Sequence, residues 1–413
     1  MTSTLLEPVA ENERVMVLDV LRGFALLGIL LVNFTGTQGT LMPGLDAFVS
    51  KALAALISES FYPLFSFLFG LGFSVQLARA GSRGSGASLL YFRRMLVLFL
   101  IGTVHATLIW AGDILVRYAI TGLLLIPLHR LPQKAVLALS VVLFATLLNG
   151  PAVRSQVESW RGAQRGAAAE LTLAARAQEE RIAENRHRLI AETGASYAVT
   201  SANRWTAYAR QVRSYGDWLS WVMNDVLFCF LVGLMVGRAR VLQEVARRRR
   251  TLLIAASTAF VTACAGLFAN AAMDLPSGFL ATAAWFAENY GMTAFYILGM
   301  ALLYTFSGHA HRVLSVFAAP GRMGLTNYLM QSVIMTWMSM SYGLGWEPST
   351  AIWLMLNLGF FFGVQVPLSR WWLKRFRYGP AEWLWRSVTY GRKQPMKLPR
   401  SALTLETAPT VTA

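Results

Sequence analysis

The stretch VMVLDVLRGFALLGILLVNFTG, residues 15 to 36, decides the fold class. Apart from Asp19, Arg22, Asn33 and Thr35 it consists of apolar residues and glycine, and it exceeds the roughly 20 residues that a helix needs to cross a hydrocarbon core. The leader before it is acidic rather than basic, and the block is longer than the apolar core of a secretory signal. We therefore expect a retained membrane span.

Nine further blocks of similar character follow: 61–80, 90–111, 113–129, 133–150, 218–238, 251–272, 284–306, 322–343 and 351–373. Of the 413 residues 55% are hydrophobic and only 14% are charged, whereas soluble domains carry roughly a quarter charged residues. The sequence predicts an all-α polytopic membrane protein with about ten transmembrane helices. This composition argues against a soluble nucleic-acid-binding protein, despite a net charge of +16.

The excess positive charge instead orients the chain, because Lys and Arg concentrate in cytoplasmic loops. One alternate set of short loops carries fourteen basic residues, and the other set carries only Lys51. The fourteen are Arg79, Arg83, Arg93, Arg94, Arg130, Lys134, Arg238, Arg240, Arg247, Arg248, Arg249, Arg250, Arg312 and Arg322. With ten spans, this pattern places both termini in the cytoplasm.

The blocks also predict the domain organisation. An amino-terminal bundle of about five spans covers 1–150, a hydrophilic insert on the outer side covers 151–217, and a second bundle covers 218–395 before a disordered cytoplasmic tail at 396–413. The composition of the insert between Ala167 and Ala191 favours helix. We interpret the insert as a helical cap on the outer face, with substrate gathering as the alternative.

Ionisable residues inside spans are costly and usually face the bundle interior or a cavity. Asp19 and Arg22 are three residues apart, so they share a helical face and can form an ion pair near the cytoplasmic end of the first span. The alternative function for Arg22 is contact with an anionic ligand.

A second group of polar residues surrounds the end of the third span. His105 is followed by Trp110, Asp113, Arg117 and Tyr118. A histidine exchanges a proton near neutral pH and suits general-base catalysis, whereas the structural alternative is a buried hydrogen-bonding role.

A third group opens the ninth span, where Pro320 and Gly321 precede Arg322 and mark a helix start. Thr326, Asn327 and Gln331 follow within about one turn of each other. They can bond neighbouring helices or line a polar cavity with Arg322 at its mouth. Cys229 and Cys264 fall inside predicted spans, and the chain has neither zinc-ligand nor phosphate-loop spacing, so no metal site is expected.

Several motifs resemble the YeiB-like bacterial membrane proteins. They are Asp19-x-x-Arg22-Gly23 with Asn33, the run from Phe61 to Gly70, His105 followed by Gly112-Asp113-Ile114-Leu115, Gly321-Arg322-Met323-x-x-Thr326-Asn327-Tyr328, and the tail Gly379-Pro380-x-Glu382-Trp383-x-Trp385-Arg386. The resemblance covers nearly all of the chain except the insert and includes a carboxyl-terminal domain of unknown function 418. It implies a multi-pass protein of the bacterial inner membrane with the lipid bilayer as its partner.

The Asp-x-x-Arg-Gly signature and the position of His105 also look like the transmembrane acyltransferases, which include heparan-alpha-glucosaminide N-acetyltransferase and the acyltransferase-3 proteins. In those families an acyl group from cytoplasmic acyl-CoA reaches an acceptor on the far side, and an intramembrane histidine is central. This resemblance implies that His105 acts as base or acyl carrier, that Asp113 orients the imidazole or the acceptor, and that Asn327 or Asn33 donates a hydrogen bond to the oxyanion.

The donor would have its phosphates at cytoplasmic arginines: Arg22, Arg93, Arg94 and Arg322. Arg93 and Arg94 lie about 17 Å from His105 along one helix, a distance that a long thioester arm can cover. Asn33, Tyr118, Thr326 and Gln331 are the expected polar lining. The alternatives are a small-molecule transporter or exporter with Asp19, Arg22, His105 and Asp113 along a polar path, and a membrane protein without turnover.

Overall fold

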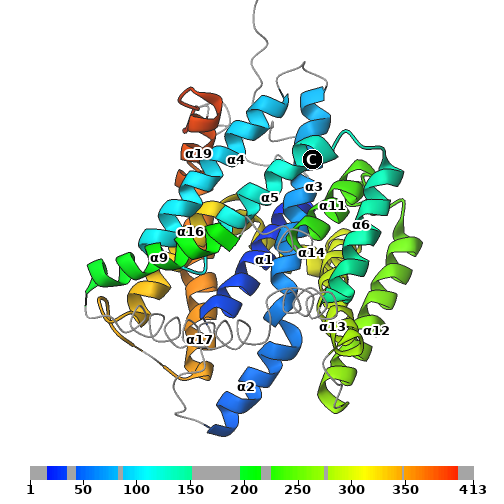
Figure 1. Ribbon diagram of the computed structural model, residues 1–413, viewed down its shortest axis with the longest axis horizontal. Coiled ribbons are helices and arrows are strands. Elements are labelled where there is room, and N and C mark those ends of the chain that lie inside the picture. The colour runs from blue at the N-terminus through cyan, green and yellow to red at the C-terminus, as the bar shows by residue number, and fades with distance from the viewer. Residues whose placement is uncertain are drawn as a thin grey trace, which may run out of the picture.

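A computed structural model describes residues 16–34, 43–81, 87–150, 196–214, 225–273, 278–346 and 348–398. These residues form a bundle of helices (Figure 1), and within the described ranges β structure is limited to isolated bridges, such as the one between Phe376 and Lys397. A helix pairs its own backbone polar groups, which an apolar surrounding requires. The predicted all-α fold class is confirmed.

The amino-terminal half contains the helices on which the site is built. They are α1 (Met16–Phe34), α2 (Pro43–Leu56), the short turn η2 (Ser58–Ser60), α3 (Phe61–Gly81), α4 (Ala87–Val104), the π-helical turn η3 (His105–Ile109), α5 (Leu115–Leu128), α6 (Gln133–Leu148) and α9 (Tyr197–Ser214). The π-turn continues α4 directly and ends at Trp110, whose backbone is extended.

The carboxyl-terminal half adds a second set of helices around α1 and α3. They are α11 (Asp225–Arg238), α12 (Arg249–Ala272), α13 (Phe279–Phe306), α14 (Gly308–Leu314), η4 (Ser315–Phe317), α15 (Ala318–Arg322), α16 (Gly324–Ser339), α17 (Thr350–Phe360), the π-turn η5 (Phe361–Gln365), α18 (Val366–Leu373) and α19 (Pro380–Tyr390).

Each of the ten predicted blocks contains a helix. By length and composition, five helical stretches of the described residues can cross a membrane: Met16–Phe34, Gly44–Gln76, Ser88–Ile109, Arg249–Ala272 and Thr350–Leu373. The stretch Phe279–Phe306 joined to Gly308–Arg322 across a 120° bend would be a sixth. The apolar helices α5 and α6 are shorter than a full span. The fold is therefore a helical membrane protein with five or six candidate spans.

Helix α1 lies at the centre of the bundle (Figure 1), packed against α3, α15, α16 and α17. Most of its apolar residues are buried, and they lie on all sides of the helix, with Val20, Leu21, Leu26 and Leu30 fully inaccessible. A helix that is apolar around its whole circumference is buried in this way. The stretch that decides the fold class is thus also the core of the structure.

Glycines let neighbouring helices approach at backbone distance, as small residues do in membrane proteins. A Cβ atom at Gly70 of α3 would lie 2.1 Å from the carbonyl oxygen of Phe230 in α11. A Cβ atom at Gly321 would lie 1.9 Å from the carbonyl oxygen of Asp19, and one at Gly23 would lie 1.9 Å from that of Phe317. These contacts fix α3 against α11 and α1 against the segment that leads into α16.

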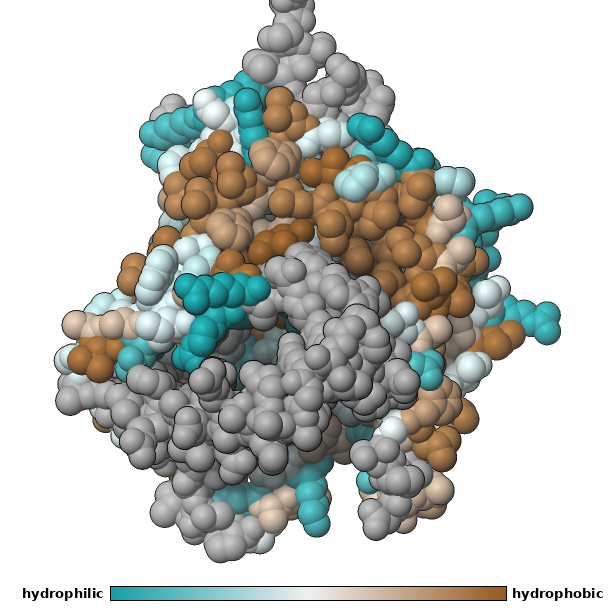
Figure 2. Space-filling model, viewed as in Figure 1, coloured by the Kyte–Doolittle hydropathy of each residue, from teal (hydrophilic) through white to brown (hydrophobic). Residues whose placement is uncertain are grey.

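Much of the surface is apolar. In Figure 2 a broad apolar band crosses the upper half of the visible face, with hydrophilic side chains above it. Large apolar side chains are exposed on several helices, among them Leu100 of α4, Val141 and Val142 of α6, and Val261 and Phe268 of α12. An exposed apolar surface of this extent suits contact with lipid.

Helices α2, α9, α14 and α19 lie outside the predicted blocks, and α15 lies outside them except for Arg322. Helix α2 occupies a stretch treated as a short outer loop, and the Asp46 side chain in it accepts a hydrogen bond from the Ala351 backbone at the start of α17, at 3.0 Å. Helix α9 is the described part of the insert, and the helix expected between Ala167 and Ala191 lies outside the described residues. Helix α19 belongs to the tail.

The expected disordered tail begins at 396, and residues 399–413 lie outside the described residues. Residues 396–398 pair with the backbone of 375–377: the Arg377 amide donates to Met396 at 2.9 Å, and the Leu398 amide donates to Arg375 at 3.3 Å. Because of this pairing, regular backbone contacts of the carboxyl-terminal half continue to residue 398, a few residues beyond the predicted boundary at 395.

We predict that Gly70→Ala destabilises the protein by about 1 to 3 kcal/mol, because the added methyl group overpacks the contact between α3 and α11. Gly359→Ala is the matched control, since a Cβ at Gly359 meets nothing within 4 Å. The control should be neutral or stabilising by up to about 1 kcal/mol, the difference in helix propensity. Thermal unfolding of both detergent-solubilised variants tests this, and equal losses would contradict the close packing.

Candidate functional site

The His105 side chain is fixed by Asp113 across the break between the π-turn and α5. Their Nδ1 and Oδ1 atoms are 2.8 Å apart, and both side chains are only 1% exposed. A carboxylate only accepts hydrogen bonds, so Nδ1 is the donor and Nε2 of the neutral ring has no proton. Nε2 is buried and has no hydrogen-bond partner in the described part of the chain.

Asp113 is in turn held by the start of α5. Its second oxygen, Oδ2, accepts a hydrogen bond from the Val116 amide at 2.9 Å. A carboxylate is favourable at a helix amino terminus, where amides lack partners and the helix dipole is positive. One carboxylate therefore joins the imidazole to a helix end, which sets the orientation of the ring.

Aromatic side chains enclose the imidazole. The Tyr328 ring of α16 lies 5.1 Å from the His105 ring, and the Trp110 ring lies 6.3 Å from it, measured between centroids. The Tyr328 hydroxyl is buried near the backbone of Ile114 without a hydrogen bond of ordinary geometry. Two aromatic rings therefore pack around the imidazole, and one of them carries a buried hydroxyl.

Helix α9 covers the π-turn that carries His105. Arg204, which is 3% exposed, donates to the Leu108 carbonyl at 3.0 Å, and the Tyr197 hydroxyl donates to the same oxygen at 2.8 Å. Thr103 and Tyr208 share a hydrogen bond of 2.7 Å between their hydroxyls. A π-turn often occurs at functional positions, and here its irregular end is stabilised by the insert.

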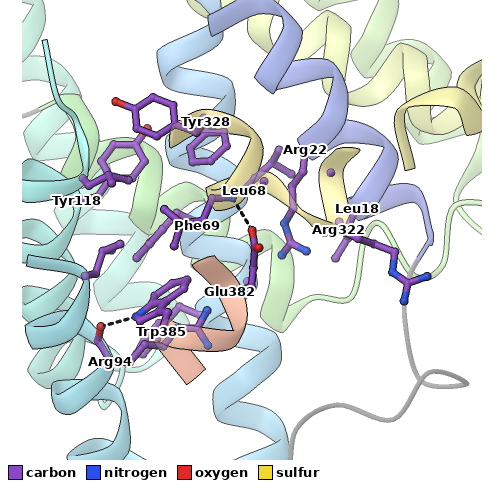
Figure 3. Close-up of a pocket in the computed structure, with 18 of the residues that line it drawn as sticks. Leu18, Arg22, Leu68, Phe69, Arg94, Tyr118, Arg322, Tyr328, Glu382 and Trp385 are labelled. Atoms are coloured by element: carbon purple, nitrogen blue, oxygen red, sulfur yellow. Dashed lines mark hydrogen bonds between the residues drawn. The ribbon is translucent and has the colours of Figure 1, made fainter. Parts of the chain in front are cut away.

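A cavity of about 270 Å³ lies between α1, α3, α4, α5, α16 and α19. In Figure 3, Tyr118 and Tyr328 lie at one end and Arg94 and Trp385 lie at the other. His105 and Asp113 do not line the cavity, but Ile114 and Tyr328 do. The deep end of the cavity therefore adjoins the histidine and aspartate through one layer of side chains.

The opposite end of the cavity is cationic. The lining of the whole cavity includes five arginines and two carboxylates: Arg22, Arg94, Arg322, Arg377, Arg386, Asp19 and Glu382. Asp19 and Arg22 form the predicted ion pair, with 3.1 Å between Oδ1 and Nη1. Arg22 lies over Gly72, where a Cβ atom would be 3.2 Å from its Nη2 atom. The remaining wall between the two ends is mostly apolar, from residues such as Leu68, Phe69 and Leu98.

Glu382 of α19 anchors the carboxyl-terminal segment to α16. Its Oε1 accepts hydrogen bonds from the amides of Leu325 at 2.7 Å and Thr326 at 3.0 Å, and its Oε2 accepts one from the Thr326 hydroxyl. Burial raises the pKa of the Glu382 carboxyl above its usual value, while the hydrogen bonds from Thr326 and Leu325 oppose the shift. The contact caps α16 and closes the cavity with α19.

Of the four arginines predicted to bind the donor, three line the cavity and one does not. Arg22, Arg94 and Arg322 line the cavity, whereas the neighbouring Arg93 is exposed and lies outside its lining. Arg94 is partly buried with its guanidinium 4.0 Å from the centre of the Trp385 ring. Arg93 and Arg94 differ because successive residues point about 100° apart around a helix.

The predicted polar residues of α16 bond a neighbouring helix. Asn327 donates to the Pro320 carbonyl at 3.2 Å and to the Ser369 hydroxyl at 3.0 Å, and its Oδ1 accepts from Gln365 at 3.2 Å. Gln331 donates to Gln365 at 2.8 Å. Both N–H groups of Asn327 are thus engaged, so in this structure it has no donor left for an oxyanion.

Three further predicted lining residues have other partners. Thr326 bonds Glu382, and Asn33 accepts a hydrogen bond from the Tyr62 hydroxyl; neither belongs to the cavity lining. Tyr118 does line the cavity, and its hydroxyl is 2.7 Å from that of Ser66. Among the described residues, no three His, Cys, Asp or Glu side chains are grouped to hold a metal ion.

Sequence reasoning gave no role to the residues that α19 and its approach contribute: Arg377, Tyr378, Glu382, Trp385 and Arg386. A signal was present, since Glu382, Trp385 and Arg386 stand in one of the recognised motifs of the tail. These residues follow the last apolar block, so the sequence did not indicate their contact with the third and ninth spans.

Comparison with known proteins identifies a family and several relatives over most of the chain. Residues 236–392 match the family described as a protein of unknown function, DUF418. The chain is 31% identical to the uncharacterized protein YxaH of Bacillus subtilis, across 95% of this chain and 98% of that protein. It is 28% identical to the uncharacterized protein YeiB of Escherichia coli, across 91% of this chain and 96% of that protein.

A third relative is the uncharacterized 39.9 kDa protein in the amylase 3′ region of Bacillus acidopullulyticus, at 28% identity across 96% of this chain and 100% of that protein. No solved structure matches the chain. The relatives match over nearly their whole length, and the family match falls in the predicted carboxyl-terminal half. The chain therefore belongs to the YeiB-like DUF418 family.

Proposed function

We propose that this protein is a membrane-embedded acyltransferase that moves an acyl group from cytoplasmic acyl-CoA to a hydroxyl or amine acceptor. The observation that carries the proposal is the buried pair of His105 and Asp113. The Nε2 atom of His105 has no hydrogen-bond partner in the described part of the chain, and one layer of side chains, including Tyr328, separates the pair from a cavity with arginines at its opposite end. A base with a free acceptor nitrogen and a fixed orientation suits proton abstraction.

The cavity suits a ligand with an anionic head and a long apolar arm. Arg22, Arg94 and Arg322 would hold the phosphates of acyl-CoA at the cationic end, and the thioester arm would lie along the apolar wall. Arg94 and His105 lie on one continuous helical segment, about 17 Å apart at 1.5 Å per residue. Arg93 is left out because it is exposed outside the cavity.

The chemical step follows from the orientation of the imidazole. Nε2 of His105 takes the proton of the acceptor as the acceptor oxygen or nitrogen bonds to the thioester carbon. The carbon–sulfur bond then breaks, and the leaving sulfur takes the proton back from the imidazolium to give free CoA. Asp113 stabilises the imidazolium through Nδ1. The buried hydroxyl of Tyr328 replaces Asn327 as the candidate oxyanion donor.

Admission of the thioester requires a movement of side chains. Tyr328 lines the cavity and packs against His105, so a rotation of its ring would join the cavity to Nε2. The acceptor would then approach from the side covered by α9, which contacts the π-turn.

The proposed topology has ten spans, with both termini on the cytoplasmic side of the bacterial inner membrane. A helix within each predicted block and the alternation of basic loops support this arrangement. It places the cationic end of the cavity, where α19 packs against the start of α4, on the cytoplasmic side.

We predict that His105→Ala lowers acyl transfer at least about 100-fold, since general-base catalysis contributes about 100- to 10,000-fold. The assay incubates membranes that contain the protein with radiolabelled acyl-CoA and follows release of free CoA and label in envelope material. His309→Ala is the matched control, because His309 is exposed on α14, and it should keep full activity. Parental activity in His105→Ala, or uptake of an unmodified solute without CoA release, would overturn the proposal.

Asp113→Asn preserves the shape of the side chain but removes its charge and one of its two acceptors. We predict a fall of about 100-fold or more in kcat with little change in KM for acyl-CoA, because the variant no longer stabilises the imidazolium. Steady-state kinetics on the same membranes measure both constants. A rise in KM at unchanged kcat would instead assign Asp113 to ligand binding.

The topology predicts the behaviour of reporter fusions. Alkaline phosphatase fused within the insert at 151–217 should be active, because that segment is proposed to lie outside. Green fluorescent protein fused to the carboxyl terminus should fluoresce, because it folds in the cytoplasm. The reverse result in either fusion would contradict the ten-span arrangement.

A further inference from the structure

The cationic end of the cavity is not neutralised by its own carboxylates. Asp19 is paired with Arg22, and Glu382 accepts hydrogen bonds from the start of α16. Arg94, Arg377 and Arg386 form no salt bridge with a carboxylate in the described part of the chain. Three guanidinium groups thus line one cavity without a direct ion pair among the described residues, in a lining where five arginines outnumber two carboxylates.

Aromatic rings hold two of these arginines in place. The Arg94 guanidinium lies 4.0 Å from the centre of the Trp385 ring, and that of Arg386 lies 4.6 Å from the centre of the Tyr378 ring. The Trp385 indole also donates to the Arg94 carbonyl at 2.9 Å. Cation–π contact orients a guanidinium while leaving its charge uncompensated.

The like charges also act on each other, since Arg386 and Arg22 lie close enough to Arg94 to repel its charge. Holding like charges together away from bulk water costs free energy unless an anion completes the site. Planar guanidinium groups match phosphate oxygens in pairs of hydrogen bonds. The arrangement therefore suits a ligand with more than one phosphate charge.

We propose that α19 is a ligand-binding element, and that Arg377 and Arg386 join Arg94 in binding a group with at least two phosphate charges. Docking through Glu382 brings α19 over the cavity and completes a site that the spans alone leave open. The inference rests on the proposed function only for the identity of the ligand as acyl-CoA. A nucleotide such as CoA and an anionic phospholipid headgroup share this chemistry.

The test measures binding to the purified full-length protein in neutral detergent, with coenzyme A and inorganic pyrophosphate as probes. Both should raise the thermal unfolding temperature of the wild type. Arg386→Gln and Arg94→Gln should each weaken CoA binding at least about tenfold, through loss of a charged hydrogen-bonding partner. Arg93→Gln is the matched control, because Arg93 neighbours Arg94 but is exposed outside the cavity, and it should bind as wild type.

His105→Ala separates this inference from the proposed function. The inference expects wild-type CoA affinity in that variant, whether or not transfer is lost. If the wild type bound CoA but showed no acyl transfer, the proposed function would be overturned, whereas the proposed phosphate site would be supported. Arg386→Gln lies on α19, away from the bundle core, so it remains a fair test if Arg94→Gln unfolds.

A second arm places the protein in nanodiscs of neutral or anionic phospholipid. Stabilisation by anionic lipid that is lost in Arg386→Gln, with no effect of CoA, would support the phosphate site and identify a headgroup as its source. Two results would overturn the inference: no response of the wild type to CoA, pyrophosphate or anionic lipid, or an equal loss of binding in Arg93→Gln and Arg94→Gln.

Discussion

Polar groups inside this bundle must find partners within the protein, because an apolar surrounding offers none of the hydrogen bonds of water. The structure meets this constraint by pairing side chains between helices. Asn327, Gln331 and Gln365 form one such network, and Tyr62 with Asn33 forms another. His105 differs, since its Nδ1 is paired with Asp113 while its Nε2 is buried without a partner among the described residues. The hydroxyls of Tyr91 and Tyr328 are also buried without a partner among the described residues, so it is the imidazole's fixed orientation by Asp113 that distinguishes His105 as the proposed base.

The positions of the helices could be predicted because helices in an apolar surrounding require long blocks of apolar residues in the sequence. Each block contains a helix, and the spacing of Asp19 and Arg22 was sufficient to predict their ion pair. The association of His105 with Asp113 was expected from the resemblance to the transmembrane acyltransferases, and the two residues lie eight positions apart on either side of the short break between two apolar blocks. The spacing of two residues in the sequence predicts their contact when they lie within about two turns of one helix, or on either side of a short connection between two helices.

The remaining features depend on rotation and on distant contacts. Helix α4 is apolar around most of its surface. Its hydrophobic pattern therefore does not predict that Arg94 faces the cavity while Arg93 faces outward. Asn327 has its partners about forty residues away, in Gln365 and Ser369, and an isolated polar residue does not reveal whether such a partner exists. The π-turn at His105 likewise follows from packing beneath α9. These features depend on tertiary contacts, which composition and periodicity do not predict.

The site draws on both halves of the chain, and α4 is the element that joins them. It carries Arg94 at one end and leads directly into His105 at the other, so a single rigid helix sets the distance between the cationic end of the cavity and the histidine. The segment matched by the family, residues 236–392, contributes Tyr328 and Arg386 but contains neither Arg94 nor His105. That segment alone therefore cannot form the site. A function that uses the whole cavity requires both bundles, which accords with relatives that align with the chain over nearly their full length rather than over the carboxyl-terminal half.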